Sequence, residues 1–283
     1  MTKLPRIARH GLVAPNVAWT LLFFLIPLGL IVVYSFGTED LVTFSVTFGW
    51  TTRNYGVLTS SLYVHTLIRS LVLSVSTTAL CAVIGFPFAY FLSRMSRRWQ
   101  GIVLVAVIVP FWTSFLVRTY AWIILLQNNG PIEGVLQKIG LLQGHLNVLY
   151  TPKSVAIGIV YGYLPLMILP IYVALERIDP RILDAAADLG APARSTFRRV
   201  VFPLGLPGLI AGTIIVGIPA TGEYLIPEIL GGGKTLMAGN ILVDQFLNLG
   251  NYPLGSALAV GLMLVLLIAA FALRRAQPVE SAT

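Results

Sequence analysis

Residues 154–175 read SVAIGIVYGYLPLMILPIYVAL, and residues 176–203 continue as ERIDPRILDAAADLGAPARSTFRRVVFP. The first stretch has no charged side chain and matches the length of about 20 residues that a helix needs to cross a bilayer. The second is basic and is divided by proline and glycine into short helical segments. An apolar run of spanning length followed by a basic loop is typical of a membrane protein.

The composition of the whole chain agrees with this interpretation. Of the 283 residues, 57% are hydrophobic and only 11% are charged, and the mean hydropathy is +0.85. Such a chain has too few polar side chains to cover a soluble globule of this length. We therefore predict an all-α membrane protein, with a transmembrane domain over residues 15–273 between tails at 1–14 and 274–283. Its six predicted spans are 15–36, 68–93, 101–127, 154–175, 204–230 and 252–273.

The first apolar run could also be a secretory signal, because Lys3, Arg6 and Arg9 precede it. Its apolar core is longer than that of a usual signal, and no clear small-x-small cleavage site follows. We expect it to be retained as a spanning helix.

The basic residues give the predicted orientation. A net charge of +8 would suggest a nucleic-acid partner in a soluble protein, but here the basic residues fall in short stretches between apolar runs, so no nucleic-acid partner is expected. The external segments hold only Arg53, Lys138, Lys153 and Lys234, while Arg69 and Arg118 fall in or beside spans. The positive-inside rule therefore predicts that both termini and the loop 176–203 are cytoplasmic. This side holds thirteen of the nineteen Lys and Arg: Lys3, Arg6, Arg9, Arg94, Arg97, Arg98, Arg177, Arg181, Arg194, Arg198, Arg199, Arg274 and Arg275.

Two external loops are long enough for structure of their own. The alternating LVTFSVTF from Leu41 predicts a short strand, and PIEGVLQKI from Pro131 predicts a short amphipathic helix. Prolines inside the spans free backbone carbonyls and suit a bundle around a wet pathway, although proline is also simply common in membrane helices. They are Pro87, Pro110, Pro165, Pro170, Pro219 and Pro227.

Several kinds of chemistry find no support. Cys81 is the only cysteine, so no intrachain disulfide can form. Three histidines scattered over the tail and external loops give no metal site and no membrane-embedded enzyme: His10, His65 and His145. GGGKT from Gly231 resembles the end of a phosphate-binding loop, but Glu228 stands where that loop needs glycine. An ATPase would have to be a separate subunit.

The loop 176–203 has clear helix signals. Asp179 is a good N-cap with Pro180 at the first helical position, and Gly190 can take the left-handed conformation that ends a helix. Pro192 then opens a second short helix, whose basic face can meet lipid headgroups or an acidic partner. An ordinary amphipathic helix on the membrane surface is the alternative.

The same loop resembles the signature of importer permeases of the ATP-binding-cassette (ABC) class, which runs Glu-Ala-Ala, three residues, Gly, nine residues, Ile-x-Leu-Pro. Here Asp184-Ala185-Ala186 precedes Gly190 by three residues, and Val200-Val201-Phe202-Pro203 follows after nine. The spacing is intact, and Asp for Glu, Val for Ile and Phe for Leu are conservative departures. The resemblance implies the type I importer permease fold and a coupling helix that docks on an ATPase subunit. It assigns that role to Asp184, Ala185, Ala186, Ala187, Asp188, Gly190 and Pro203.

Over most of the chain the resemblance is to permeases for spermidine and putrescine. The stretches that carry it are PFWTSFLVRTYAW from Pro110, NNG from Asn128, IDPRILDAAADLGA from Ile178 and PATGEYLIPEILGG from Pro219. It implies a non-catalytic polyamine permease in the bacterial inner membrane, with an ATPase dimer that binds ATP and Mg²⁺, a second and different permease, and an extracytoplasmic binding protein. Permeases for opines, amino-acid-like solutes or iron are the alternative, and an ion-coupled secondary transporter would usually need more spans.

Candidate substrate-pathway residues lie in the third and fifth predicted spans and are Trp112, Arg118, Tyr120, Glu223, Tyr224 and Glu228. Glu223 is well inside the fifth span, where an ionisable group is costly unless it faces a polar pathway or a partner. Either it meets a cationic solute, or it forms a structural ion pair with Arg118 of the third span. Glu228 lies near the outer end, which is already hydrated. Aromatic faces that could hold an ammonium group, or simply pack, are Trp112, Tyr120, Trp122 and Tyr224.

Overall fold

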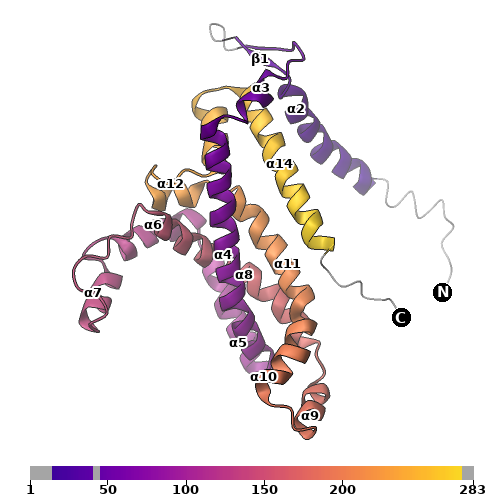
Figure 1. Ribbon diagram of the computed structural model, residues 1–283, viewed down its shortest axis with the longest axis vertical. Coiled ribbons are helices and arrows are strands. Elements are labelled where there is room, and N and C mark those ends of the chain that lie inside the picture. The colour runs from indigo at the N-terminus through magenta and orange to yellow at the C-terminus, as the bar shows by residue number, and fades with distance from the viewer. Residues whose placement is uncertain (1–14, 41–44, 276–283) are drawn as a thin grey trace, which may run out of the picture. The chain divides into compact units, whose positions relative to one another are not determined.

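A computed structural model describes residues 15–40 and 45–275, which are mostly helical (Figure 1). The described residues form two compact units, one of residues 15–40, 45–64 and 242–265 and one of residues 65–241 and 266–275. Within these ranges, five helices are long and apolar enough to cross a membrane, and a bent pair of helices makes a sixth if it is one span. The fold class is therefore an all-α membrane protein with five or six candidate spans.

The first unit contains the N-terminal apolar helix, which runs over Pro15–Tyr34. A short antiparallel hairpin follows, with two residues in each strand, in which Thr38 pairs with Thr47. Only the last part of the strand predicted from Leu41 can be compared with the structure, where it forms β2, because residues 41–44 lie outside the described residues. The elements are η1 (Leu21–Leu25), α2 (Ile26–Tyr34), β1 (Thr38–Glu39), β2 (Val46–Thr47), α3 (Arg53–Val57), η4 (Asp244–Asn248) and most of α14 (Tyr252–Arg275).

The second unit is built around α4, α8 and α11. Figure 1 shows α9 and α10 together at one end of α11 and α12 at its other end. The amphipathic helix predicted at Pro131 is present as α7. The elements are α4 (Ser61–Ser93), α5 (Arg97–Ile108), η2 (Val109–Trp112), α6 (Phe115–Leu126), α7 (Pro131–Lys138), α8 (Pro152–Glu176), α9 (Pro180–Asp188), α10 (Ala193–Thr196), η3 (Phe197–Val201), α11 (Phe202–Thr221), α12 (Leu225–Gly231) and α13 (Ala238–Val243).

Small residues let α8 and α11 pack closely. A Cβ atom at Gly208 would lie 2.5 Å from the Pro170 carbonyl oxygen, and one at Gly212 would lie 2.7 Å from Met167 Sδ. Close approach through small residues is the usual way in which membrane helices associate, since lipid and side chains are equally apolar. The core beside this contact contains Phe86, Ala89, Leu92, Met167, Ile171, Leu175, Val201 and Val216.

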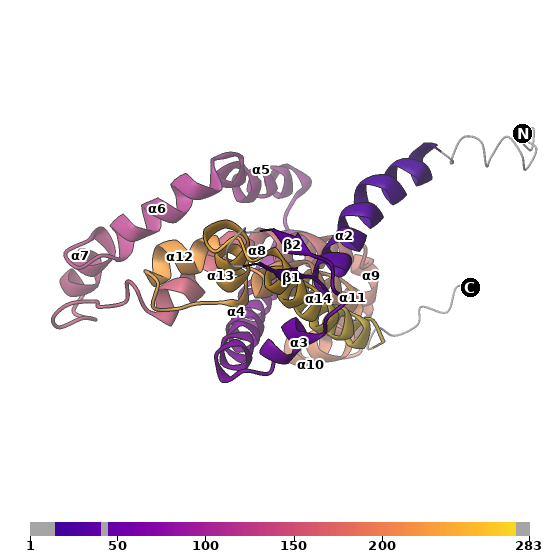
Figure 2. The same cartoon turned by 90° about the horizontal axis from the view of Figure 1, so that it is seen from above.

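The third predicted span, 101–127, is not one continuous helix. Residues Arg97–Trp112 and Phe115–Lys138 are bent by 94° relative to each other, and Figure 2 shows α5, α6 and α7 following one another along one edge of the unit. Pro110 cannot donate a helical hydrogen bond, and Thr113 and Ser114 then adopt extended ψ angles of 155° and 133°. The sequence expectation missed this break because the apolar composition continues through it.

The fifth predicted span, 204–230, is also interrupted. The helix ends at Thr221, and a short second helix, α12, begins at Leu225. The other four predicted stretches coincide with helices of spanning length, although α4 begins at Ser61, before the predicted start. The two broken spans, the third and the fifth, are the ones that contain the candidate substrate residues.

Candidate functional site

The predicted coupling helix comprises residues 180–188, keeps the name coupling helix below, and begins as its sequence predicts. Asp179 Oδ1 accepts a hydrogen bond of 2.9 Å from the backbone N–H of Arg181, and Pro180 occupies the first helical position. A capping carboxylate also interacts favourably with the positive end of the helix dipole. The start of this helix is therefore fixed by local chemistry.

The end of the coupling helix is a Schellman motif. Gly190 has φ +75°, its N–H donates to the Ala187 carbonyl at 2.8 Å, and the Ala191 N–H donates to the Ala186 carbonyl at 3.0 Å. These two bonds satisfy carbonyls that the helix end would leave unpaired. A Cβ atom at Gly190 would meet nothing within 4 Å. Glycine is therefore favoured there by the positive φ angle and not by a lack of space for a side chain.

The coupling helix presents small and acidic side chains to its surroundings. Asp184, Ala185, Ala187 and Asp188 are exposed, while Ala186 is half-buried. Two apolar residues that the sequence analysis did not single out share this surface, since Ile182 is 47% exposed and Leu189 is 87% exposed. Ile182, Ala185 and Leu189 are spaced i, i+3 and i+7, which places them on one face of the helix. The spacing could have identified them.

The second predicted short helix is the beginning of the fifth span. Residues Ala193–Thr221 form one run of 29 helical residues, in which α10 continues through the π-helical turn η3 into α11. The Phe197 ring lies 5.8 Å from the Phe86 ring and 5.9 Å from the Tyr90 ring of α4. Pro203 is the second residue of α11 and therefore lies inside this continuous helix.

Glu223 caps the second half of the broken fifth span. Its Oε1 accepts hydrogen bonds from the backbone N–H groups of Leu225 at 3.0 Å and Ile226 at 3.5 Å. Its Oε2 accepts a bond of 2.7 Å from the Tyr163 hydroxyl of α8. The residue is 8% exposed. A carboxylate at a helix N-terminus is stabilised by these donors and by the helix dipole, so Glu223 holds α12 in place at the break.

Further contacts at the break come from α13. Asn240 Nδ2 donates to the Tyr224 carbonyl at 3.0 Å and to Glu228 Oε2 at 2.9 Å. A Cβ atom at Gly239 would lie 2.3 Å from the Gly222 carbonyl oxygen, so α13 touches the broken backbone directly. The Glu228 and Tyr224 side chains are exposed beside this junction.

A row of buried hydroxyl groups ties the same region to α4. Ser70 Oγ accepts a bond of 2.7 Å from the Ala238 N–H, and Ser74 Oγ donates to the Gly217 carbonyl at 2.9 Å. Thr221 Oγ1 donates to Ser74 Oγ at 2.9 Å. The sequence analysis did not identify Asn240 or these hydroxyl groups, because their partners lie far away along the chain.

The alternative ion pair between Glu223 and Arg118 is not formed. Within the described part of the chain, no ion pair involves Glu223 or Arg118. The Arg118 guanidinium lies over the Phe111 ring at 4.4 Å, and its Nε and Nη1 are buried without a hydrogen-bond partner. Arg118 packs by a cation–π contact across the bend between η2 and α6.

The candidate aromatic residues are not gathered around Glu223. Trp112 is 83% exposed and Tyr120 is 55% exposed, and Trp122 packs edge-on against Tyr161 at 5.2 Å between ring centroids. No ring contact or hydrogen bond joins Trp112 or Tyr120 to Glu223 among the residues described. Only Tyr224, the neighbour of Glu223 in sequence, lies at the break.

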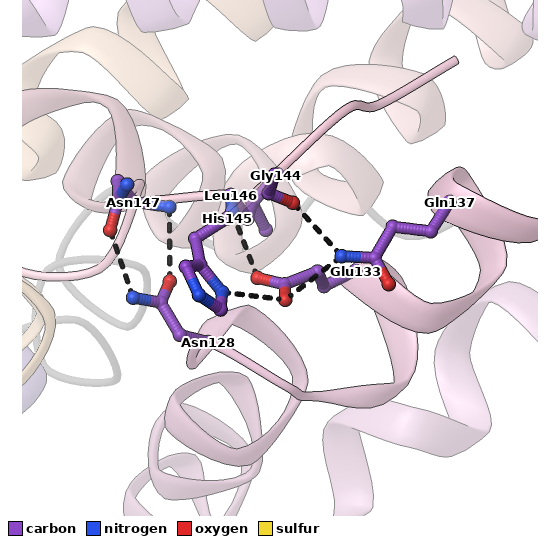
Figure 3. A network of polar contacts seen from close by, with 7 residues as sticks. All are labelled: Asn128, Glu133, Gln137, Gly144, His145, Leu146 and Asn147. Carbon is purple, nitrogen blue, oxygen red and sulfur yellow. Dashed lines mark hydrogen bonds and ion pairs between the residues drawn. The ribbon is translucent and has the colours of Figure 1, made fainter. Parts of the chain in front are cut away.

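A polar network fixes the segment after α7 (Figure 3). Glu133 is 1% exposed; its Oε2 accepts from the Leu146 N–H at 2.8 Å, and its Oε1 lies 3.1 Å from His145 Nδ1. The Leu146 N–H, more than the other donors, holds the pKa of the Glu133 carboxyl below its usual value. Asn128 and Asn147 bond to each other beside it at 2.8 and 3.1 Å. The loop 140–150 is therefore held against α7.

Comparison with known proteins identifies the family of this chain. Residues 82–277 match the family of binding-protein-dependent transport system inner membrane components. The chain belongs to this family. The matched residues include the coupling helix and both broken spans.

Two relatives of the permease are similar over nearly their whole length. The spermidine/putrescine transport system permease protein PotB of Escherichia coli (strain K12) is 38% identical over 250 residues, which are 88% of this chain and 90% of that protein. PotB of Haemophilus influenzae is 39% identical over 259 residues, 92% of this chain and 90% of that protein. The permease is thus similar to these proteins along almost all of its sequence.

The fold is shared with a solved transporter. A chain in the crystal structure of a bacterial ABC transporter involved in the import of the acidic polysaccharide alginate has a TM-score of 0.70 and 16% sequence identity. The match covers 96% of the permease and 98% of that chain. The permease therefore has the fold of an ABC importer subunit.

Proposed function

We propose that the permease is the membrane-spanning subunit of an ATP-driven importer of polyamines such as spermidine and putrescine. The observation that carries this proposal is the 38% identity with PotB over 90% of that relative. Opine, amino-acid-like and iron importers have related permeases, and these solute classes are the competing outcomes of the test below.

In this proposal the permease works with three kinds of partner. The surface from Asp184 in α9 to Gly190 in the turn after it docks on an ATPase dimer that binds ATP and Mg²⁺. A second and different permease completes the pathway, and an extracytoplasmic binding protein delivers the solute. Both termini are cytoplasmic, as the distribution of Lys and Arg supports. Closure of the ATPases moves the coupling helices and thereby alternates access.

The contacts at the break indicate different roles for its two carboxylates, Glu223 and Glu228. Glu223 is a positioning residue, because its oxygens are occupied by two backbone N–H groups and the Tyr163 hydroxyl. Glu228 is exposed, and Asn240 holds one of its oxygens. Glu228 and the 42% exposed Tyr224 ring are therefore the groups that a passing ammonium ion meets. Arg118 would repel such a cation and does not take part.

Uptake by the whole transporter tests the substrate class. The permease and its partner subunits are expressed in bacteria that lack polyamine import, and entry of radiolabelled spermidine and putrescine is measured. We expect saturable uptake that unlabelled polyamines block, and Glu228→Gln should raise the KM because it removes a charge that the ammonium meets. Uptake of an opine, an amino acid or chelated iron, with none of either polyamine, would contradict the proposal.

The orientation has a separate test. In a Cys81→Ser background, cysteines at Lys138 and Lys234 should react with an impermeant thiol reagent added outside intact cells, and cysteines at Arg97 and Arg198 should not. External labelling at Arg198 would place the coupling helix on the wrong side for a cytoplasmic ATPase.

A further inference from the structure

Three arginines line a hollow next to the coupling helix. Arg194, Arg198 and Arg199, with Pro192 and Ser195, surround a space of about 660 Å³ at the start of the helix that becomes the fifth span. All three arginine side chains are exposed. The hollow is thus open and strongly basic.

The orientation of this basic surface is fixed by packing. On the other side of the same helical turns, Val201 is fully buried and Phe197 packs against the Phe86 and Tyr90 rings of α4. Rotating the helix to turn the arginines inward would expose this apolar contact. The three guanidinium groups are therefore held facing away from the core.

Nothing in the described residues neutralises the hollow. Among these residues, the side chains of Arg194, Arg198 and Arg199 make no ion pair and no hydrogen bond. Three like charges close together repel one another, which favours an anion between them. Guanidinium groups suit phosphate because they can donate two parallel hydrogen bonds to it.

The depth of the hollow indicates where that anion comes from. The helix continues from Ala193 to Thr221, so the apolar stretch from Val200 to Thr221 is about 33 Å long, close to the roughly 30 Å of bilayer hydrocarbon. Arg194 begins about 9 Å before Val200 along the axis, within the headgroup layer. The coupling helix α9 lies farther out, beyond α10 (Figure 1).

We propose that this hollow binds the phosphate of an anionic phospholipid headgroup next to the coupling helix. The lipid would neutralise Arg194, Arg198 and Arg199 at the point where the loop enters the membrane. The proposal concerns a lipid site and does not depend on which solute the transporter carries.

The test uses the whole transporter, purified in detergent and titrated with dioctanoyl phosphatidylglycerol, dioctanoyl phosphatidylcholine or inorganic phosphate. Bound lipid is counted by native mass spectrometry. Arg198→Gln/Arg199→Gln is compared with the matched double variant Arg177→Gln/Arg181→Gln, which removes two charges from the same loop outside the hollow. Each basic residue near an anionic surface contributes about fivefold to binding, so the first variant should bind phosphatidylglycerol at least about tenfold more weakly.

We expect the wild type and the matched control to prefer phosphatidylglycerol over phosphatidylcholine, and inorganic phosphate to compete poorly. Arg198→Lys/Arg199→Lys keeps the charge and should recover part of the binding, which separates the effect from misfolding. Equal losses in both Gln variants, or no preference for the anionic lipid, would overturn the proposal. Full competition by inorganic phosphate would also overturn it, as would ATPase release by Arg198→Gln/Arg199→Gln with lipid binding unchanged, since partner carboxylates would then occupy the hollow.

Discussion

The coupling helix and the break in the fifth span are built in opposite ways. At the coupling helix, the hydrogen bonds that begin and end the helix join residues at most five positions apart, from the Asp179 cap to the Ala191 bond, and the outer side chains stay exposed. At the break, Glu223 bonds to a hydroxyl 60 positions away, and Asn240 reaches back to Tyr224 and Glu228. The ends of one segment are fixed by local hydrogen bonds, and the other segment is a junction between helices.

This difference decides how each segment responds to change. A substitution in the coupling helix alters a local conformation and the surface offered to a partner, while the helical bundle persists. A substitution at the break removes contacts on which several helices depend. We therefore expect large losses of stability at the break and large losses of coupling, with little loss of stability, at the loop.

The largest effect on stability is expected for Gly239→Ala. The added Cβ would lie 2.3 Å from the Gly222 carbonyl oxygen, which is backbone and cannot rotate away. Separating α13 from the break should cost about 3 kcal/mol, measured by thermal unfolding of the detergent-purified transporter. Gly134→Ala is the control, because a Cβ there meets nothing within 4 Å and its backbone is helical. Equal stability of the two variants would show that α13 does not support the break.

The next effect is expected for Glu223. Glu223→Ala leaves the Leu225 N–H and the Tyr163 hydroxyl without their acceptor and should cost about 2 kcal/mol. Glu223→Gln keeps an acceptor for the backbone and should cost about 1 kcal/mol. A double-mutant cycle with Tyr163→Phe should show coupling, and one with Arg118→Gln should show none. Coupling to Arg118 alone would restore the ion-pair hypothesis.

A smaller loss of stability is expected for Gly190→Leu, with a large loss of transport. The positive φ of +75° should cost about 1 kcal/mol for a residue with a side chain. The displaced helix end should weaken ATPase association, measured by co-purification, and abolish uptake. Gly190→Asn is the control, since asparagine tolerates this conformation and should keep most activity. Wild-type uptake by Gly190→Leu would mean that this turn plays no part in coupling.

The smallest effect is a pH dependence at Glu133. Because the folded state lowers the pKa of this carboxyl, its stabilisation is complete above the unfolded value of about 4.3 and disappears as the pH falls through the lower folded value. The difference in Tm between wild type and Glu133→Gln should therefore vanish in acid. His145→Gln should keep most of this dependence, because the Leu146 N–H is the main cause. A difference that persists at pH 2 would contradict the assignment.

The sequence predicted those parts of the structure whose causes are local. The Asp179 cap, the left-handed Gly190 and the amphipathic α7 were all foreseen, because each depends on a few consecutive residues. Apolar length likewise located the long helices. Composition could not reveal the bend at Thr113, since an apolar segment keeps its hydropathy whether it is straight or bent.

The substrate region was harder to predict because its contacts are distant in sequence. Glu223 was recognised as costly to bury, but its partner is Tyr163 and not Arg118. Burial cost identifies a residue that needs a partner without saying which partner it finds. Gly239 and Asn240 were missed for the same reason, since their roles exist only where α13 meets the break.

The uninterrupted helix from Ala193 to Thr221 gives the permease a mechanical lever. Its 29 residues make a rod about 43 Å long, attached at one end to the coupling helix and at the other to the break at Glu223. If its inner end is held, a tilt of about 10° moves the outer end by about 7.5 Å. The π-helical turn η3 joins α10 to α11 without ending the helix, so we expect a displacement of the loop to move the outer end of this helix as well.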